Sequence, residues 1–291
     1  QKLGTLYDKT QRIRQLSSVI ADTIGANKED TEIAGSICKA DLVSDLVGEY
    51  PELQGTIGRY FALEQGFSQE ISNAIQNHYL PLGPSGKVPK EKISIAVAVA
   101  DKIDTLIGFF GIYEKPTSSK DPFALRRACL GVLRLITENK ISLSLKEILN
   151  NSKNLYLAQN YQLTNEKVIE DLFQFFIERF KINLRDKGAR LDVTNSILEN
   201  NRSDDFYLIM KNINELSKCL KKSQGQDAIS IYKRSKNILD QSDQEEEFFG
   251  NPDNVLFQHP SEDEILIKLN EARDYFTTPS RLRDNEKTIT L

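Results

Sequence analysis

The chain has 291 residues, of which 39% are hydrophobic, so it can form one large domain or two ordinary ones, and two is the better expectation. A formal net charge of −4 excludes a protein that is basic throughout, and any contact with nucleic acid must therefore be a local basic patch. The three cysteines are far apart in the sequence, which excludes a cysteine-rich metal site and favours a reducing compartment.

Apolar residues recur at helical spacing in nearly every segment, so the sequence predicts an all-α fold. In the first half we expect helices at residues 5–24, 30–50, 51–66, 68–80, 93–112 and 115–136. Residues 137–163 are polar and are interpreted as a connection between two bodies. In the second half we expect helices at residues 166–184, 189–199, 204–222, 226–240 and 261–276, with an acidic, solvated loop at 240–254.

The helix expected at residues 115–136 opens with adjacent arginines. Asp121 is a suitable N-cap for it, and Pro122 suits the first helical position. Arg127, Gly131 and Arg134 then fall on one stripe of the helix, with a side-chain-free gap between two guanidinium groups. This stripe could receive phosphate, or the two arginines could pair with carboxylates of the protein itself.

Carboxylates recur in two of the expected helices. Asp41, Asp45 and Glu49 repeat every four residues, and Asp101 and Asp104 lie three apart in the most apolar helix. Buried carboxylates need partners, so these five could bind a divalent cation or neutralise Arg59, Arg126 and Arg127. Internal pairing is the favoured interpretation. The sequence shows no nucleophile paired with a base and no phosphate-binding glycine loop.

The order of these segments resembles the HD phosphohydrolase superfamily, which gathers histidines and aspartates from successive helices on a metal ion. The matching positions are Lys9, the pair Ala40–Asp41 and Asp101, with His78 as a further degenerate position. Two histidine ligands are missing, because an ammonium group repels a cation and alanine offers no lone pair. The resemblance therefore predicts an HD-like scaffold that binds no metal.

A more specific resemblance rests on long runs in a consistent order, namely "KLGTLYDK", "KADLVSDLVGEYPELQGTIGRYFA", "HYLP", "VADKIDTLIGFFGI", "PTSSKDPFALRRACLGVLRLI", "GARLDVTNSIL" and "YKRSKNIL". These runs are similar to the β subunit of bacterial glycyl-tRNA synthetase. The resemblance implies the C-terminal part of that subunit, since the chain opens on Gln1. It also implies an HD-like helical domain at residues 1–150 and an anticodon-binding helical bundle at 151–291.

The same resemblance implies partners and a division of labour. The partners are glycine tRNA and the α subunit of a heterotetramer, and the α subunit is the chain that uses ATP and Mg²⁺ to attach glycine. This chain would be a non-catalytic, cytoplasmic part of a glycine–tRNA ligase, with no cofactor of its own and no membrane partner.

The basic residues within these runs are the candidates for tRNA contact. They are Arg127, Arg134, Arg190, Lys233, Arg234 and Lys236. We expect Arg126 to brace Asp101 or Asp104 instead, and Tyr232 either to stack on a base or to lie partly in the core. Two alternatives stay open: a metal-dependent HD phosphohydrolase acting on nucleotides or RNA ends, and an HD-like body that serves only in assembly.

Overall fold

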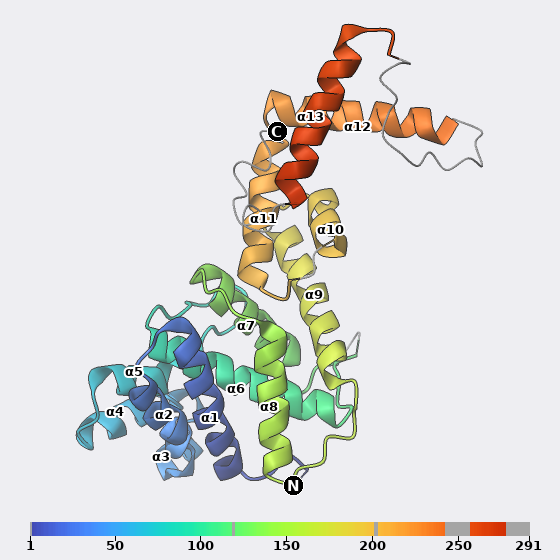
Figure 1. Ribbon diagram of the computed structural model, residues 1–291. Coiled ribbons are helices and arrows are strands. Elements are labelled where there is room, and N and C mark those ends of the chain that lie inside the picture. Colours follow the sequence, from blue (N-terminus) through green and yellow to red (C-terminus); the bar gives the residue numbers. More distant parts are fainter. Residues whose placement is uncertain (1, 118–119, 201–202, 242–256, 278–291) are drawn as a thin grey trace. The chain divides into compact units, whose positions relative to one another are not determined.

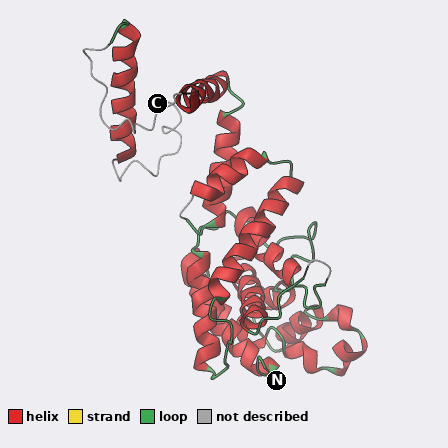
Figure 2. Ribbon diagram, turned by 90° about the vertical axis from the view of Figure 1, so that its right-hand side faces the viewer, coloured by secondary structure: helices red, strands yellow, loops and turns green. Residues whose placement is uncertain are grey.

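The structure is a computed structural model that describes residues 2–117, 120–200, 203–241 and 257–277. These residues form helices and no strand, which confirms the all-α prediction (Figure 2). The helices are α1 (Leu6–Ile24), α2 (Lys28–Ile37), η1 (Ala40–Val43), α3 (Asp45–Glu49), η2 (Pro51–Leu53), α4 (Thr56–Glu64), α5 (Gln69–Asn77), α6 (Lys92–Gly111), α7 (Leu125–Glu138), α8 (Leu145–Ala158), α9 (Val168–Asp186), α10 (Leu191–Asn200), α11 (Phe206–Cys219), α12 (Ser223–Gln241) and α13 (Pro260–Thr277).

The chain divides into two compact units, residues 1–210 and 211–291. Helix α6 is the centre of the first unit and contacts α1, α2, α5, α7, α8 and α9 (Figure 1). Its sequence explains this position, because it is apolar around nearly its whole circumference and a helix of that kind is stable only when it is covered on all sides. The two aspartates of α6, Asp101 and Asp104, are therefore held inside the unit.

Helix α1 begins and ends where the sequence predicts. The Thr5 side chain accepts the Asp8 N–H at 3.1 Å, and the Asp8 carboxylate accepts the Thr5 N–H at 2.8 Å, which forms a capping box. At the other end Gly25 adopts a φ of 67°, a left-handed conformation that glycine tolerates best. These caps fix the start of α1 and so the position of Lys9 and Arg12 one to two turns later.

The prediction of one helix over residues 30–50 is wrong. The chain forms α2, then the short η1, and then α3, which Ser44 begins by accepting the Val47 N–H at 3.3 Å. The Asp41 carboxylate instead accepts N–H groups from Gly55 and Gly58, and this tertiary contact replaces a continuous helix. Asp41, Asp45 and Glu49 therefore do not share a helix face.

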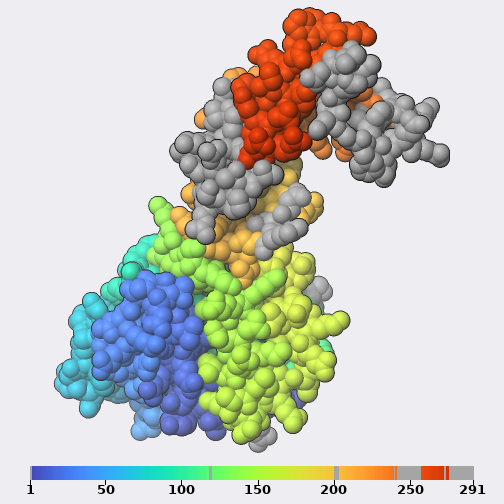
Figure 3. Space-filling model, in the orientation of Figure 1, coloured from blue at the N-terminus to red at the C-terminus, as the bar shows by residue number. Residues whose placement is uncertain are grey.

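Residues 137–163 are not merely a connection, because they contain α8. This helix packs against α1, α6 and α9, and its surface lies beside that of α1 in the space-filling view (Figure 3). Its buried Tyr156 reaches Asp104 of α6. The predicted boundary at residue 150 falls inside α8, whereas the compact units divide between residues 210 and 211.

The helices expected after residue 160 are confirmed with small shifts of their ends. Helix α9 turns one apolar face to the core, since Leu172, Phe176 and Phe180 are fully or almost fully buried. Phe206 packs on Phe180 with ring centroids 5.1 Å apart. The predicted acidic loop lies outside the described residues from position 242 on, as does the tail from 278. Among the described helices, none is long and apolar enough to cross a membrane.

Candidate functional site

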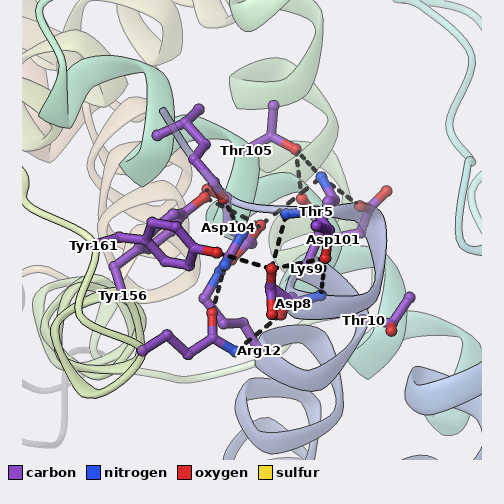
Figure 4. A network of polar contacts seen from close by, with 12 residues as sticks. Thr5, Asp8, Lys9, Thr10, Arg12, Asp101, Asp104, Thr105, Tyr156 and Tyr161 are labelled. Carbon is purple, nitrogen blue, oxygen red and sulfur yellow. Dashed lines mark hydrogen bonds and ion pairs between the residues drawn. The ribbon is translucent and has the colours of Figure 1, made fainter. Parts of the chain in front are cut away.

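A buried ionic cluster joins α1, α6 and the turn after α2. Asp101 is only 8% exposed and lies between two lysines. Lys9 Nζ is 2.9 Å from Asp101 Oδ1, and Lys39 Nζ is 3.0 Å from Asp101 Oδ2. Lys9 also donates to Thr105 Oγ1 at 2.6 Å (Figure 4). Two ammonium groups thus flank a single carboxylate, at two of the positions for which the sequence predicted degenerate metal ligands.

The charges of the cluster decide its protonation. Burial by itself would raise the pKa of Asp101, but the charges of Lys39 and Lys9 lower it well below its usual value. Burial also lowers the pKa of Lys102 to about 8. Lys102 Nζ donates to the carbonyls of His78 and Leu80 at 2.9 and 2.8 Å. Asp101 is therefore ionised at neutral pH and needs no external cation.

A second buried pair lies next to the first on α6. Arg12 Nε donates to Asp104 Oδ1 at 2.6 Å, and both residues are 1% exposed. Burial would lower the pKa of Arg12, but its hydrogen bond and charge interaction with Asp104 raise it overall. The guanidinium carbon lies 3.8 Å from the centre of the Tyr156 ring, and Tyr156 donates to the Asp104 carbonyl at 3.0 Å (Figure 4). This pair ties α1, α6 and α8 together.

The remaining HD-like positions are also engaged within the fold. His78 is fully buried, and its Nδ1 lies 2.6 Å from the Ile75 carbonyl oxygen. Burial, followed by the charge of Lys39, lowers the pKa of His78 well below its usual value, so the ring is neutral. Asp41 Oδ2 accepts the Gly55 N–H at 2.6 Å and the Gly58 N–H at 3.1 Å.

These residues do not fit a divalent metal. Both oxygens of Asp101 face ammonium groups, which repel a cation, and Ala40 has no donor atom. Within the described ranges, no group of three or more His, Cys, Asp or Glu side chains could hold a metal ion. Lys39 was not predicted from the sequence, and together with Lys9 it balances the buried carboxylate that a metal would otherwise neutralise.

The start of α7 differs in detail from the prediction. Asp121 does cap the helix, although it lies four residues before Leu125, the first residue of α7. Its two carboxylate oxygens accept the N–H groups of Leu125 and Arg126 at 2.8 and 2.9 Å. Ala124, rather than Asp121, precedes the first helical residue, with a φ of 52°. The cap therefore fixes Arg126 and Arg127 in the first turn of α7.

The expectation that Arg126 braces Asp101 or Asp104 is wrong, because lysines and Arg12 hold those carboxylates. Arg126 donates instead to the carbonyl of Thr117. Arg127 is exposed, and none of the described carboxylates forms an ion pair with it. The structure thus leaves Arg127 available for an external anion.

Arg134 lies in a different environment. It is 7% exposed, and its Nε donates to Glu138 Oε1 at 2.7 Å while its NH1 group donates to the Gly83 carbonyl at 2.9 Å. The gap left by Gly131 is filled by Lys102, since a side chain at Gly131 would approach Lys102 Cε to 2.8 Å. For Arg134 the structure shows the internal ion pair that the sequence left open as an alternative, and its contact with phosphate stays a prediction.

The other predicted tRNA-binding residues are exposed. Arg190 pairs with Asp192, two residues further along, at 2.5 Å. Lys233, Arg234 and Lys236 lie on α12. Tyr232 on the same helix is 66% exposed, so the expectation that it lies partly in the core is wrong for this chain. Helix α12 therefore presents three cations and an aromatic ring to solvent.

Comparison with known proteins gives the family. The family model described as "Glycyl-tRNA synthetase beta subunit" matches residues 1–199. The chain belongs to the glycyl-tRNA synthetase beta subunit family. A glycine–tRNA ligase beta subunit from Ruegeria sp. (strain TM1040) is 42% identical over 275 residues, which are 93% of this chain and 38% of that protein. The corresponding subunit from Paracoccus denitrificans (strain Pd 1222) is 39% identical over 285 residues, which are 97% of this chain and 40% of that protein.

This member of the glycyl-tRNA synthetase beta subunit family spans about two fifths of the length of those two relatives. The resemblance found in the sequence is therefore confirmed at the level of the family. Sequence reasoning missed Lys39 and Arg12 as partners of the buried carboxylates, and Lys102 as a buried cation held by the carbonyls of His78 and Leu80. A usable signal existed for Lys102, because it interrupts an otherwise apolar stretch and a charge in such a position requires partners, whereas Arg12 lies in a polar stretch and gave no such signal.

Proposed function

We propose that this chain is a tRNA-binding part of a glycyl-tRNA synthetase beta subunit, and that it supports the ATP-dependent attachment of glycine to its tRNA by an α subunit. Family membership supports this proposal, and one structural observation carries it: the exposed run Lys233, Arg234 and Lys236 on α12. None of the described carboxylates forms an ion pair with these three cations, and exposed cations on an acidic protein are suited to neutralise phosphates.

In this proposal the chain binds glycine tRNA and the α subunit, in the cytoplasm, and contributes no catalytic group. ATP and Mg²⁺ are used by the α subunit. Arg127 and Arg190 would contact the RNA backbone as well. Arg190 would have to exchange its exposed pairing with Asp192 for phosphate, which costs little because exposed ion pairs are weak. Tyr232 would add a stacking surface for an unpaired base.

The HD-type phosphohydrolase alternative is disfavoured by the geometry around Asp101. Hydrolysis in that superfamily needs a metal-bound water, and here Lys9 and Lys39 hold the oxygens that would ligate the metal. An HD-like body that serves only in assembly would be indicated if Arg127→Gln left RNA binding unchanged while neutralising the α12 cations weakened it.

The test measures affinity for glycine tRNA and for an unrelated tRNA at several salt concentrations. In one variant three exposed cations of α12 are neutralised, namely Lys233→Gln, Arg234→Gln and Lys236→Gln. In the matched control three exposed lysines of the first unit are neutralised, namely Lys2→Gln, Lys28→Gln and Lys167→Gln. We expect the α12 variant to bind more weakly, with a log K against log salt slope shallower by about 2 to 3, because each lost phosphate contact removes roughly 0.7 to 0.9 from it.

The control variant should keep the affinity of the wild-type chain, and its log K against log salt slope should change by less than about one. Equal weakening of the two variants would show that binding follows net charge rather than α12. Equal affinity of the wild-type chain for both tRNAs would contradict recognition of glycine tRNA within these residues.

A further inference from the structure

A basic pocket lies in the first unit, between the first turn of α7 and the last turns of α9. Its volume is about 380 Å³, within the range of small-ligand sites. We call it the arginine pocket and define it by six of the residues that line it: Arg126, Arg127, Leu130, Arg179, Ile182 and Lys187. Asn183, Asp186 and the loop residues Gly83 and Pro84 complete the lining.

Most of the positive charge in the arginine pocket is not balanced by carboxylates of the described residues, although Lys187 Nζ lies 3.8 Å from Glu138 Oε1. Within the described part of the chain, no carboxylate forms an ion pair with Arg126, Arg127 or Arg179. Arg179 Nε is buried and has no hydrogen-bond partner there. The one carboxylate in the lining, Asp186, lies 3.6 Å from Arg185, which is outside the pocket. Guanidinium groups that converge without carboxylate partners among the described residues favour a phosphate, which a guanidinium can bind through two parallel hydrogen bonds.

Apart from its charged residues, the arginine pocket is lined by aliphatic side chains, an amide and the loop residues Gly83 and Pro84. Leu130 stands one turn after Arg126 on α7, and Ile182 stands one turn after Arg179 on α9, so each helix brings one guanidinium and one aliphatic side chain to the same space. Both aliphatic residues are half-buried, and Asn183 adds a donor and an acceptor next to Ile182. An apolar wall beside cations suits a flat, weakly polar group attached to an anion.

We infer that the arginine pocket receives one unpaired nucleotide of a bound RNA, with its phosphate on the arginines and its base against Leu130 and Ile182. This inference rests on the proposed function, since it assumes that the chain binds RNA. A divalent cation is disfavoured by the charge, and an acidic peptide would leave the apolar wall without a partner. A free nucleotide has the same chemistry, so the experiment must distinguish the two sources.

The experiment uses the whole 291-residue chain and a fluorescent single-stranded RNA hexamer. Competitors are the same hexamer unlabelled, a duplex RNA of equal length, a nucleoside monophosphate, inorganic phosphate and polyglutamate. The variants are Arg179→Met and Arg127→Gln for the phosphate, and Leu130→Asn for the base. The matched control is Lys167→Met, which removes one exposed charge just before the start of the same α9.

We expect each arginine variant to weaken binding of the hexamer about tenfold, as the loss of a charge-assisted hydrogen bond predicts. Leu130→Asn should weaken it with an unchanged salt dependence, because it removes an uncharged contact. Lys167→Met should change the affinity by less than about twofold. Arg127 is exposed, so its variant tests the pocket even if Arg179→Met fails to fold.

Three outcomes would overturn the inference. Duplex RNA, inorganic phosphate or polyglutamate competing as well as the unlabelled hexamer would show that the pocket reads charge alone. A monophosphate binding as tightly as the hexamer would assign the pocket to a free nucleotide. Unchanged hexamer and tRNA binding by both arginine variants, together with the expected loss in the α12 variant, would remove the pocket while leaving the proposed function intact. Equal binding of glycine tRNA and an unrelated tRNA by the wild-type chain would instead count against the proposed function.

Discussion

The buried pair of Arg12 and Asp104 should be the most sensitive point of the first unit. We consider Asp104→Asn, which keeps the shape of the side chain and removes its charge. The Arg12 guanidinium would keep Gln159 Oε1 at 2.6 Å and the Leu3 carbonyl at 3.3 Å, but it would lose its counter-charge inside the protein. Removing one partner of a buried pair costs about 3 to 5 kcal/mol, because the remaining charge stays desolvated.

The magnitude can be compared within the same protein. Asp22 pairs with Lys28 at 2.8 Å, but the two side chains are 58% and 54% exposed. An exposed pair contributes about 0 to 1 kcal/mol, so Asp22→Asn is a matched control with the same chemical change. For a unit of this size each kcal/mol shifts the melting temperature by about 2 to 4 °C, so we expect a loss of roughly 10 °C for Asp104→Asn.

The assay is urea unfolding followed by far-ultraviolet circular dichroism, since the chain has no tryptophan to report its unfolding. A double variant, Arg12→Met with Asp104→Leu, should recover at least half of the lost stability, because it removes both charges and leaves apolar groups in their place. Equal losses in Asp104→Asn and Asp22→Asn would refute the reasoning. A double variant less stable than Asp104→Asn would refute it as well.

Two further predictions concern the stability of the first unit, and they depend on the buried His78 and on the Asp121 cap of α7. His78 is buried and its pKa is lowered well below the usual value, so below about pH 6.5 the unfolded chain binds a proton that the folded chain does not. The free energy of unfolding should therefore fall with decreasing pH, by up to about 1.4 kcal/mol per pH unit. In urea titrations between pH 7 and 5, His78→Asn should make this dependence on pH less steep. The exposed His259 is the control, and an equal effect of His259→Asn would contradict the assignment. Asp121→Ala should lower the free energy of unfolding by about 1 to 2 kcal/mol, because it leaves two N–H groups at the start of α7 without acceptors. Asp121→Asn should lower it less. Equal urea midpoints for the wild type and Asp121→Ala would count against the cap.

The sequence predicts most of the helices because their signals are local. Helical spacing of apolar residues and the Gly25 stop define α1, and a continuous apolar surface defines α6 as a core helix. Where the helix prediction fails, the local sequence pattern is helical but a tertiary contact decides the structure. Residues 30–50 carry a helical pattern, yet the Asp41 carboxylate accepts hydrogen bonds from the N–H groups of Gly55 and Gly58, and the helix is interrupted there.

The partners of the charged residues were decided by tertiary structure. The apolar surroundings of Asp101 and Asp104 indicated that these carboxylates need partners, and the resemblance to the HD superfamily implied that Lys9 replaces a metal ligand. The sequence did not show that Lys39 and Arg12 are the other partners, since they lie 62 and 92 residues away from these carboxylates. Nor did spacing separate Arg127 from Arg134, although one is exposed and the other is paired with Glu138.

The sequence by itself therefore determined the helical class, the family and the need of each buried charge for a partner. Only the tertiary structure decided which partner each charge has, and that three arginines, with no carboxylate partner in the described part of the chain, converge on one pocket. The physical reason is that helix formation depends on residues three and four apart, whereas an ion pair depends on which helices pack together, and packing brings together residues that are distant in the sequence.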